Sequence, residues 1–352
     1  MSALLHHRYA KPHRQQRGVT LIELMVAITV GLILLAGIIQ LFVSNKKAYQ
    51  IQEATNVLNE NARYAADQIE YHLRMADHWA GAPTDQVTVS SGITTLPADC
   101  GSTGAVISAV GIKGFDGTGS SSPLTCIPNG DYVNKSDMIA IHYSGPLRVP
   151  DATVSTAGVN LFVRGVTGRT ALIFEGQDFA TIPANMTVAQ DSGNPDLYAN
   201  YTYNSVVYFV RKCASQDRGA SATACDTGDD TTPTLARLVL TGNQLVQEDV
   251  IPGVEQMQVT YGVDLNADRA ADRYDNAAAV TTANNWPNVV SVRLSLLVRS
   301  DEYDPNFTDA GTYRLYGGAS GAGEIYTVPT ADQHYHRRLF NFTIQIRNMT
   351  RG

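Results

Sequence analysis

The chain has 352 residues, of which 44% are hydrophobic and 17% charged, so it can bury one large core or two small ones. This composition excludes a disordered chain, and the 29 glycines and 14 prolines exclude collagen-like and low-complexity sequences. The net charge of -7 argues against binding to nucleic acid through bulk positive charge, so no nucleic-acid partner is expected.

The N-terminus combines a basic segment with a long apolar one. Residues 1–18 contain four basic residues and no acidic ones, and residues 19–43 contain a single charge, Glu23. As a helix, the apolar segment would be about 37 Å long, enough to cross a bilayer. The positive-inside rule predicts that residues 1–18 stay in the cytoplasm. The residues after the apolar segment are then expected on the other side of the inner membrane, in the periplasm.

Two more common interpretations each leave a feature of this apolar segment unexplained. A cleaved secretory signal has a shorter apolar core, of about 7–15 residues. A plain signal anchor leaves Glu23 unexplained, because a carboxylate inside a membrane span is costly and usually functional.

Gly18 to Leu24 reads GVTLIEL, and this motif resembles the class III signal of type IV pilins and pseudopilins. In that family a prepilin peptidase cleaves after the glycine and methylates the new amine. The resemblance implies a leader at residues 1–18, a mature chain that begins at Val19, and Glu23 as its fifth residue. Val19 departs from the pattern, in which Phe or Met is commoner.

The resemblance also implies a role for Glu23 in filament assembly. In lipid neither the amine of one subunit nor the carboxylate of its neighbour is stable alone, so their pairing favours docking. The alternative is a protonated glutamate that reaches toward the membrane surface.

After the apolar segment the sequence predicts an amphipathic continuation of the same helix. Residues 44–77 contain no glycine and no proline, and Ala80-Gly81-Ala82-Pro83 is a clear stop signal. One helix from Val19 to Asp77 would be about 88 Å long. We expect residues 44–80 to pack against the head through one stripe of apolar or small side chains. The stripe consists of Ile51, Ala54, Leu58, Ala62, Ala65, Ile69, Leu73 and Ala76.

Residues 81–352 predict a β-rich extracytoplasmic head. Residues 290–296 and 340–346 alternate apolar and polar side chains, which is typical of half-buried antiparallel strands. Residues 84–135 and 301–333 read as irregular insertions. The predicted strands are 138–143, 161–166, 171–174, 206–211, 235–240, 254–263, 289–299 and 339–347.

The predicted fold class is α+β. The resemblance implies a pilin-like architecture, in which a long N-terminal helix, half of it transmembrane, packs on an antiparallel β-sheet head with loop insertions. The late strands, the ending Arg347-Asn348 and the chain length also resemble the PilW-type minor pilins.

Four cysteines, Cys100, Cys126, Cys213 and Cys225, fall outside the cytoplasm in this topology, where disulfides persist. Three connectivities are open, and we favour pairing of neighbours, Cys100 with Cys126 and Cys213 with Cys225. Zinc binding is the alternative, but the spacings lack C-x₂-C.

Residues 264–275 have the spacing of a calcium loop, with oxygen-bearing side chains at positions 1, 3, 5, 9 and 12. PilW-like proteins often carry an Asp-rich turn here. Two features depart from the pattern: Arg269 replaces the sixth-position glycine, and an aspartate replaces the final glutamate. An acidic solvated turn is the alternative. The candidate ligands of a Ca²⁺ ion are Asp264, Asn266, Asp268, Asp272 and Asp275.

No catalytic motif is present, so we do not expect an enzyme. His334 and His336 are expected at the start of a surface strand rather than at a metal. The sequence predicts a minor pilin that primes assembly of a type IV pilus or lies in its tip complex at the cell surface. Its expected partners are the prepilin peptidase, other major and minor pilins, the inner-membrane assembly machinery and a tip adhesin.

Two other functions stay open at this point. One is a minor pseudopilin of a type II secretion system, which carries the same N-terminal motif. The other is a signal-anchored binding domain or enzyme outside the cell, which only the Gly/Ser-rich loops and the 17 tyrosines support.

Overall fold

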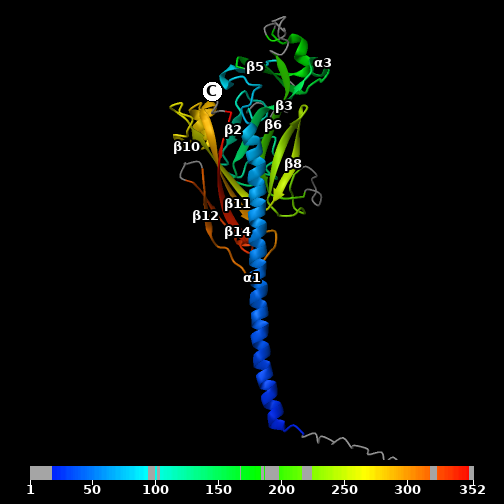
Figure 1. Ribbon diagram of the computed structural model, residues 1–352, viewed down its shortest axis with the longest axis vertical. Coiled ribbons are helices and arrows are strands. Elements are labelled where there is room, and N and C mark those ends of the chain that lie inside the picture. The colour runs from blue at the N-terminus through cyan, green and yellow to red at the C-terminus, as the bar shows by residue number, and fades with distance from the viewer. Residues whose placement is uncertain are drawn as a thin grey trace, which may run out of the picture. The chain divides into compact units, whose positions relative to one another are not determined.

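The computed structural model describes residues 18–93, 100, 104–166, 168–183, 186, 198–215, 224–317 and 323–348. Residues 1–17, which make up almost all of the predicted leader, lie outside the described residues. The chain divides into two compact units, residues 1–53 and 54–352, which are treated separately below. Helix α1 (Leu21–Met75) contributes to both units (Figure 1).

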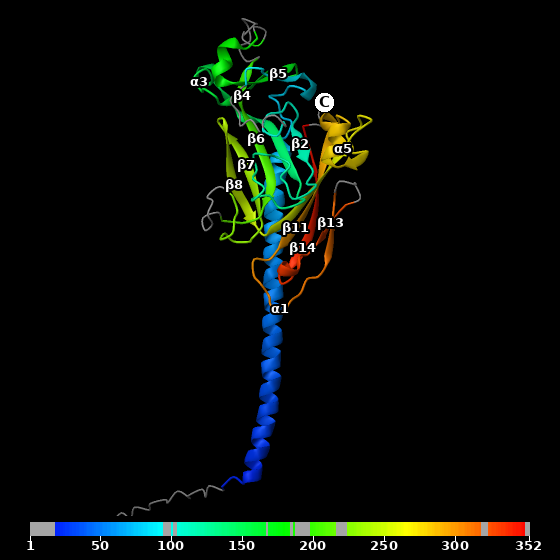
Figure 2. The ribbon, with the colours of Figure 1, turned by 180° about the vertical axis from the view of Figure 1, so that it is seen from behind.

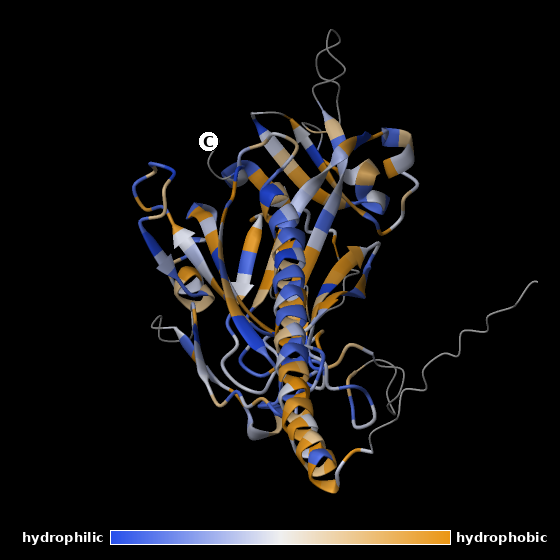
Figure 3. Ribbon diagram, turned by 60° about the horizontal axis from the view of Figure 1, so that its bottom comes forward, coloured by the Kyte–Doolittle hydropathy of each residue, from blue (hydrophilic) through white to orange (hydrophobic). Residues whose placement is uncertain are grey.

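In the first unit, the part of α1 that follows Leu21 is predominantly apolar around its circumference (Figure 3). Its large side chains up to Val43 are exposed, as shown by Ile33 at 73%. Within the described part of the chain, α1 is the one helix that is long and apolar enough to cross a membrane. An all-round apolar surface suits a helix surrounded by lipid or by other helices.

The second unit contains an eight-stranded sheet organised around β6 (Ala199–Arg211). Strand β3 (Met138–Val149) pairs along one edge of β6, and β4 (Leu161–Val166) and β7 (Thr234–Thr241) share the other edge. All pairs in this sheet are antiparallel except β1 with β5. The remaining strands are β1 (Val87–Val89), β2 (Ile112–Phe115), β5 (Thr170–Glu175) and β8 (Gln244–Pro252).

A second, antiparallel sheet has the strand order β10-β9-β11-β14, and β12 and β13 form a separate hairpin (Figures 1 and 2). The predicted α+β class is therefore confirmed. The short helices α3 (Asp151–Val154) and α5 (Ala277–Thr282) lie between strands. The strands are β9 (Val254–Val263), β10 (Arg273–Asp275), β11 (Val289–Arg299), β12 (Thr312–Leu315), β13 (Glu324–Thr327) and β14 (Arg337–Gln345).

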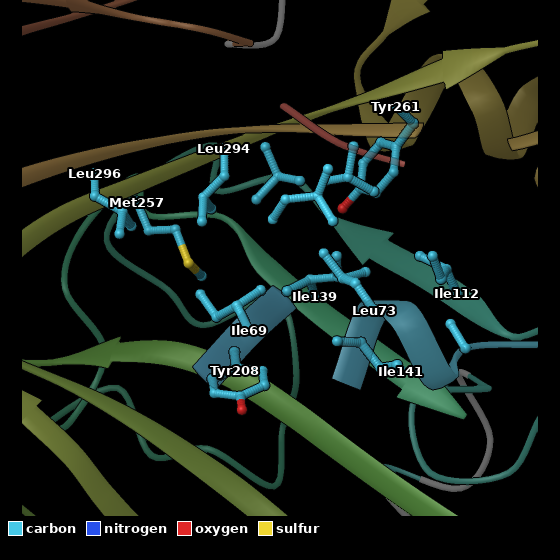
Figure 4. Close-up of a cluster of buried hydrophobic side chains, with 14 of the residues drawn as sticks. Ile69, Leu73, Ile112, Ile139, Ile141, Tyr208, Met257, Tyr261, Leu294 and Leu296 are labelled. Carbon is cyan, nitrogen blue, oxygen red and sulfur yellow. The ribbon is translucent and has the colours of Figure 1, made fainter. Parts of the chain in front are cut away.

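The part of α1 in the head unit contributes directly to the main core. Ile69 and Leu73 are fully buried and meet Ile139 of β3, Met257 of β9 and Leu294 of β11 in one cluster (Figure 4). Both sheets therefore bury apolar side chains against the same helix. The predicted stripe is buried from Leu58 to Ala76.

The end of α1 is fixed by backbone geometry and by a distant side chain. Asp77 has a φ of +61°, a left-handed conformation that stops the helix just before this residue. The side-chain amide of Asn348 donates hydrogen bonds to the carbonyl oxygens of Arg74, Met75 and Ala76, at 3.4, 3.3 and 2.9 Å. The carbonyl groups at the end of α1 have no N–H partner within the helix, and the side chain of Asn348 supplies a donor to them instead.

The outer face of β11 differs from the prediction of a half-buried strand. Ser291 and Ser295 are 6% and 0% exposed, so the polar face is buried as well. The segment predicted to be an irregular insertion, 301–333, contains β12 and β13, and the backbone N–H of Tyr316 donates to Ser295 Oγ at 2.9 Å. Ser291 instead lies against β10, where its Oγ is 3.0 Å from the hydroxyl of Tyr274. The second strand predicted to be half-buried, β14, has exposed polar residues alternating with partly buried apolar ones.

Candidate functional site: the N-terminal motif and the head loops

The backbone around the predicted cleavage position is irregular and exposed. Gly18, Val19 and Thr20 precede the first turn of α1, so the Gly18–Val19 peptide bond lies outside the helix. A protease needs an accessible backbone, and residues 18–20 are exposed and outside regular secondary structure.

Thr20 and Glu23 form a reciprocal N-terminal cap on α1. The backbone N–H of Thr20 donates to Glu23 Oε2 at 2.9 Å, and the hydroxyl of Thr20 donates to the same oxygen at 2.8 Å. The backbone N–H of Glu23 donates to Thr20 Oγ1 at 3.4 Å. This is a capping box, and it also places a carboxylate at the positive end of the helix dipole. Thr20 was not among the predicted site residues, although the spacing T-x-x-E is a recognisable signal for it.

The cysteines form two disulfides, Cys100–Cys126 and Cys213–Cys225, and the described residues include no free cysteine. This is the pairing of neighbours that the sequence favoured over zinc binding. Cys100 is fully buried in the cluster of β3 and β6 side chains, whereas the backbone N–H of Cys225 donates to Asp131 Oδ1 at 2.6 Å. Each bridge therefore ties a loop segment to the eight-stranded sheet.

The candidate calcium loop connects β9 to β10 and is closed by its own hydrogen bonds. Asp264 accepts from the backbone N–H groups of Ala267 and Arg269, both at 2.7 Å. Burial raises the pKa of Asp264, but the hydrogen bonds from these N–H groups, that of Arg269 first, lower it. The net shift of the pKa is downward. Ala267 and Arg269 have φ values of +63° and +70°, so the sixth position has the left-handed backbone that glycine favours there.

The predicted calcium ligands are only partly brought together. The side-chain amide of Asn266 donates to Asp268 and Asp272, both at 3.2 Å. Asp275 instead lies in β10 and pairs with Arg273 at 2.7 Å. Among the described residues, no group of three or more His, Cys, Asp or Glu side chains has the arrangement of a metal site.

His334 and His336 lie just before β14 and hold the insertion in place. The Nδ1 atom of His334 is 2.6 Å from the carbonyl oxygen of Phe307, and the ring of His336 stacks on Phe307 at 3.9 Å. His336 Nε2 is 3.5 Å from a carboxylate oxygen of Asp304. Their contacts are therefore structural, as expected for the start of a strand.

Comparison with known proteins gives two family-model matches. Residues 13–39 match the prokaryotic N-terminal methylation motif, which covers the Gly18–Glu23 segment. Residues 207–348 match type IV pilus-assembly protein W, from the middle of β6 to the Asn348 cap. A type IV-like pilin from Thermus thermophilus aligns with 84% of this chain and 97% of its own, at 11% identity and a TM-score of 0.34. No match is found among curated proteins.

The exposed apolar helix therefore starts inside a segment that is similar to the prokaryotic N-terminal methylation motif, and the same chain carries an α+β head. Residues 207–348, which include β9, β11 and β14, are similar to type IV pilus-assembly protein W.

Proposed function

We propose that the chain is a minor pilin that is cleaved after Gly18, methylated on the amine of Val19 and incorporated into a type IV pilus. Residues 1–18 are the leader, residues 19–43 hold the precursor in the inner membrane and form the filament core, and the head is periplasmic before assembly. The observation that carries the proposal is Glu23, which lies at the start of an exposed apolar helix inside the matched methylation motif.

The proposed role is to prime assembly or to act in the tip complex at the cell surface. The partners are the prepilin peptidase, other major and minor pilins, the inner-membrane machinery and a tip adhesin. The match to pilus-assembly protein W favours a pilus over the alternative, a type II secretion pseudopilus, because the N-terminal motif alone is shared by both.

The first experiment is intact-mass analysis of the protein from its native membranes and from sheared surface filaments. We expect a chain that begins with N-methylated Val19 in both fractions. A Gly18→Val variant, which retains the apolar helix, is the matched control and should keep the leader. A wild-type chain that retains Met1, or that is cleaved within the apolar segment, would contradict the proposal.

The second experiment separates the two machines. Deletion of the gene should reduce surface pili and twitching while leaving type II secretion of exoproteins unchanged. Normal piliation with a loss of secretion would assign the chain to the pseudopilus instead.

Calcium binding by residues 264–275 stays a prediction. If Ca²⁺ binds, calorimetric titration should give heat and the melting temperature should rise with Ca²⁺ concentration, as binding to the native state requires. Asp268→Asn, at the tip of the loop, should weaken both effects. No heat and no shift in melting temperature would reject the prediction.

A further inference from the structure

The segment between β11 and β14 is held together at its two ends and carries the β12–β13 hairpin beside the second sheet (Figures 1 and 2). The described residues of this segment, 301–317 and 323–333, are called the cover below. At its base, the backbone N–H of Ser300 donates to the carbonyl oxygen of His336 at 2.8 Å, and the N–H of His336 donates to Ser300 Oγ at 3.1 Å. Because these bonds close the base, movement of the cover as a unit does not require β11 to separate from β14.

The cover is attached to the sheet through few apolar side chains. None of the four apolar clusters formed by the described residues contains a side chain from the cover. Its two buried aliphatic residues, Leu315 and Val328, lie outside these clusters. Apolar burial is the main force that holds an element to its fold, so it contributes less to the attachment of the cover than to the cores of the head.

The strongest contacts of the cover are carboxylates placed on buried arginines. Within the sheet, Arg337 Nε and Nη2 donate to Glu255 at 2.5 and 2.9 Å, and the side chain of Arg337 is fully buried. The cover adds Asp309, whose Oδ2 is 3.6 Å from Arg337 Nη1. It also adds Asp332, whose Oδ1 is 3.4 Å from Arg299 Nη1. The sheet therefore supplies two guanidinium groups and one carboxylate, and the cover supplies two carboxylates.

The closed arrangement leaves a buried donor unsatisfied. The Nε atom of Arg299 has no hydrogen-bond partner among the described residues, and such a donor raises the free energy of the closed state. Opening would let water reach this group and both carboxylates of the cover, which offsets part of the lost ion pairing.

The face beneath the cover is polar. Gly317 of the cover lies against Gln258 and Thr260 of β9, and the N–H of Tyr316 donates to Ser295 of β11. Water can satisfy these side chains when the cover opens, whereas an apolar face would resist exposure. Opening of the cover is therefore compatible with an intact head.

We propose that the cover is a detachable unit, which opens and closes on the second sheet while the head stays folded, and that the carboxylates of Asp309 and Asp332 are its latch. The inference depends only on the head and is independent of the proposed function in pilus assembly.

Three substitutions separate the latch from charge in general. Asp309→Asn and Asp332→Asn keep the size of the side chain and an acceptor oxygen but remove the negative charge that pairs with an arginine. Glu302→Gln makes the same change of charge at an exposed residue of the cover outside the ionic cluster, and it is the matched control. Asp332 is partly exposed, so its substitution leaves the folding of the head unaffected.

The test is native-state hydrogen exchange of the full chain in detergent, under oxidising conditions, read by mass spectrometry. In the wild type we expect β12 and β13 to exchange roughly 100-fold faster than β9 and β11, because the cover opens without global unfolding. Each latch substitution should increase exchange in β12 and β13 by about tenfold and by the same factor in both strands, since one opening event exposes both. Exchange in β9 and β11, and the melting temperature, should not change. Glu302→Gln should match the wild type.

Four results would overturn the proposal. Equal exchange rates in β12, β13, β9 and β11 would show that the cover unfolds only with the head. Faster exchange of β9 and β11 in both latch variants would mean that the two carboxylates stabilise the whole head. Different factors in β12 and β13 would indicate fraying of single strands, and an effect of Glu302→Gln as large as that of Asp309→Asn would exclude a specific latch.

Discussion

At the residue scale, Asn348 joins the C-terminal part of the head to the end of α1. Its amide donates to three carbonyl oxygens in the last turn of α1, more than 270 residues away in sequence. Asn348→Ala should lower the free energy of unfolding by about 1 kcal/mol, because the partly buried carbonyl groups of Met75 and Ala76 lose their donor. Asn348→Asp should cost more at neutral pH, since a carboxylate can only accept and would face oxygen atoms.

Denaturant unfolding of the full chain in detergent measures both effects. Gln345→Ala, an exposed change on β14, is the matched control and should be close to neutral. Equal stability of Asn348→Asp and the wild type at neutral pH would show that the cap does not contribute.

A second residue-scale prediction concerns the loop between β9 and β10. Ala267 is exposed and has a φ of +63°, a conformation in which its Cβ is strained. Ala267→Gly should therefore stabilise the head by about 0.5–1 kcal/mol, after allowing for the greater freedom of glycine in the unfolded chain. Ala270→Gly, in the same loop but without a positive φ, should destabilise it. Melting temperatures of the two variants give the comparison, and a lower value for Ala267→Gly would contradict the argument.

At the element scale, the packing of the end of α1 buries two titratable groups, His72 and Asp77, whose pKa values shift in opposite directions. His72 contacts Tyr143 at 2.9 Å, and burial together with the nearby charge of Arg237 lowers its pKa to about 4, while Glu248 acts in the opposite direction. Burial raises the pKa of Asp77 to about 6, against the hydrogen bonds from Thr84 and Trp79.

These shifts predict opposite pH dependences. The native state disfavours charged His72, so the stability it contributes is complete above pH 6.5 and is lost as the pH falls toward 4. Asp77 favours its protonated form, so its contribution is complete below pH 3.8 and is lost as the pH rises through 6. As the pH falls from 7 to 5, the shifted pKa of His72 lowers the free energy of unfolding by about 2 kcal/mol, and His72→Asn should abolish this loss. Asp77→Asn should instead make the free energy of unfolding fall more steeply over the same interval. Unfolding free energies at the two pH values test this; parallel pH profiles for both variants and the wild type would contradict it.

Strand-forming patterns in the sequence located several elements well and failed where tertiary context decides. The predicted ends of β4, β9 and β11 agree with the structure, because these strands are continuous apolar or alternating runs. Strand β8 was not among the predicted strands; it contains Glu248 and Asp249, charges that an edge strand tolerates. The Asn348 cap could not be predicted either, since no local pattern reports a contact between residues more than 270 positions apart. The capping box of Thr20 is local, and its spacing alone could have revealed it.

At the scale of the whole molecule, the proposed filament segment and the core of the head use different parts of one helix. The first part of α1, up to Val43, is exposed and apolar, with its single carboxylate, Glu23, near the proposed cleavage position. The second part is amphipathic and completes the core of the head. The head was predicted from the sequence to begin after residue 80. Side chains of α1 that belong to the core of the head lie before that boundary, and the compact unit begins at Ala54.

This placement predicts how the chain can be shortened. A fragment of residues 54–352, produced under oxidising conditions, should be soluble and unfold cooperatively, because Leu58, Ile69 and Leu73 remain in the core. A fragment of residues 81–352 loses all three; each such loss from a core costs about 2–5 kcal/mol, and a domain has only about 5–15 kcal/mol in total. It should aggregate or lack a cooperative transition. Circular dichroism and thermal melts of the two fragments, with residues 44–352 as the control for length, decide the matter. A cooperative melt of 81–352 would mean that the sheets form their core without the helix, and that α1 only docks onto a finished head.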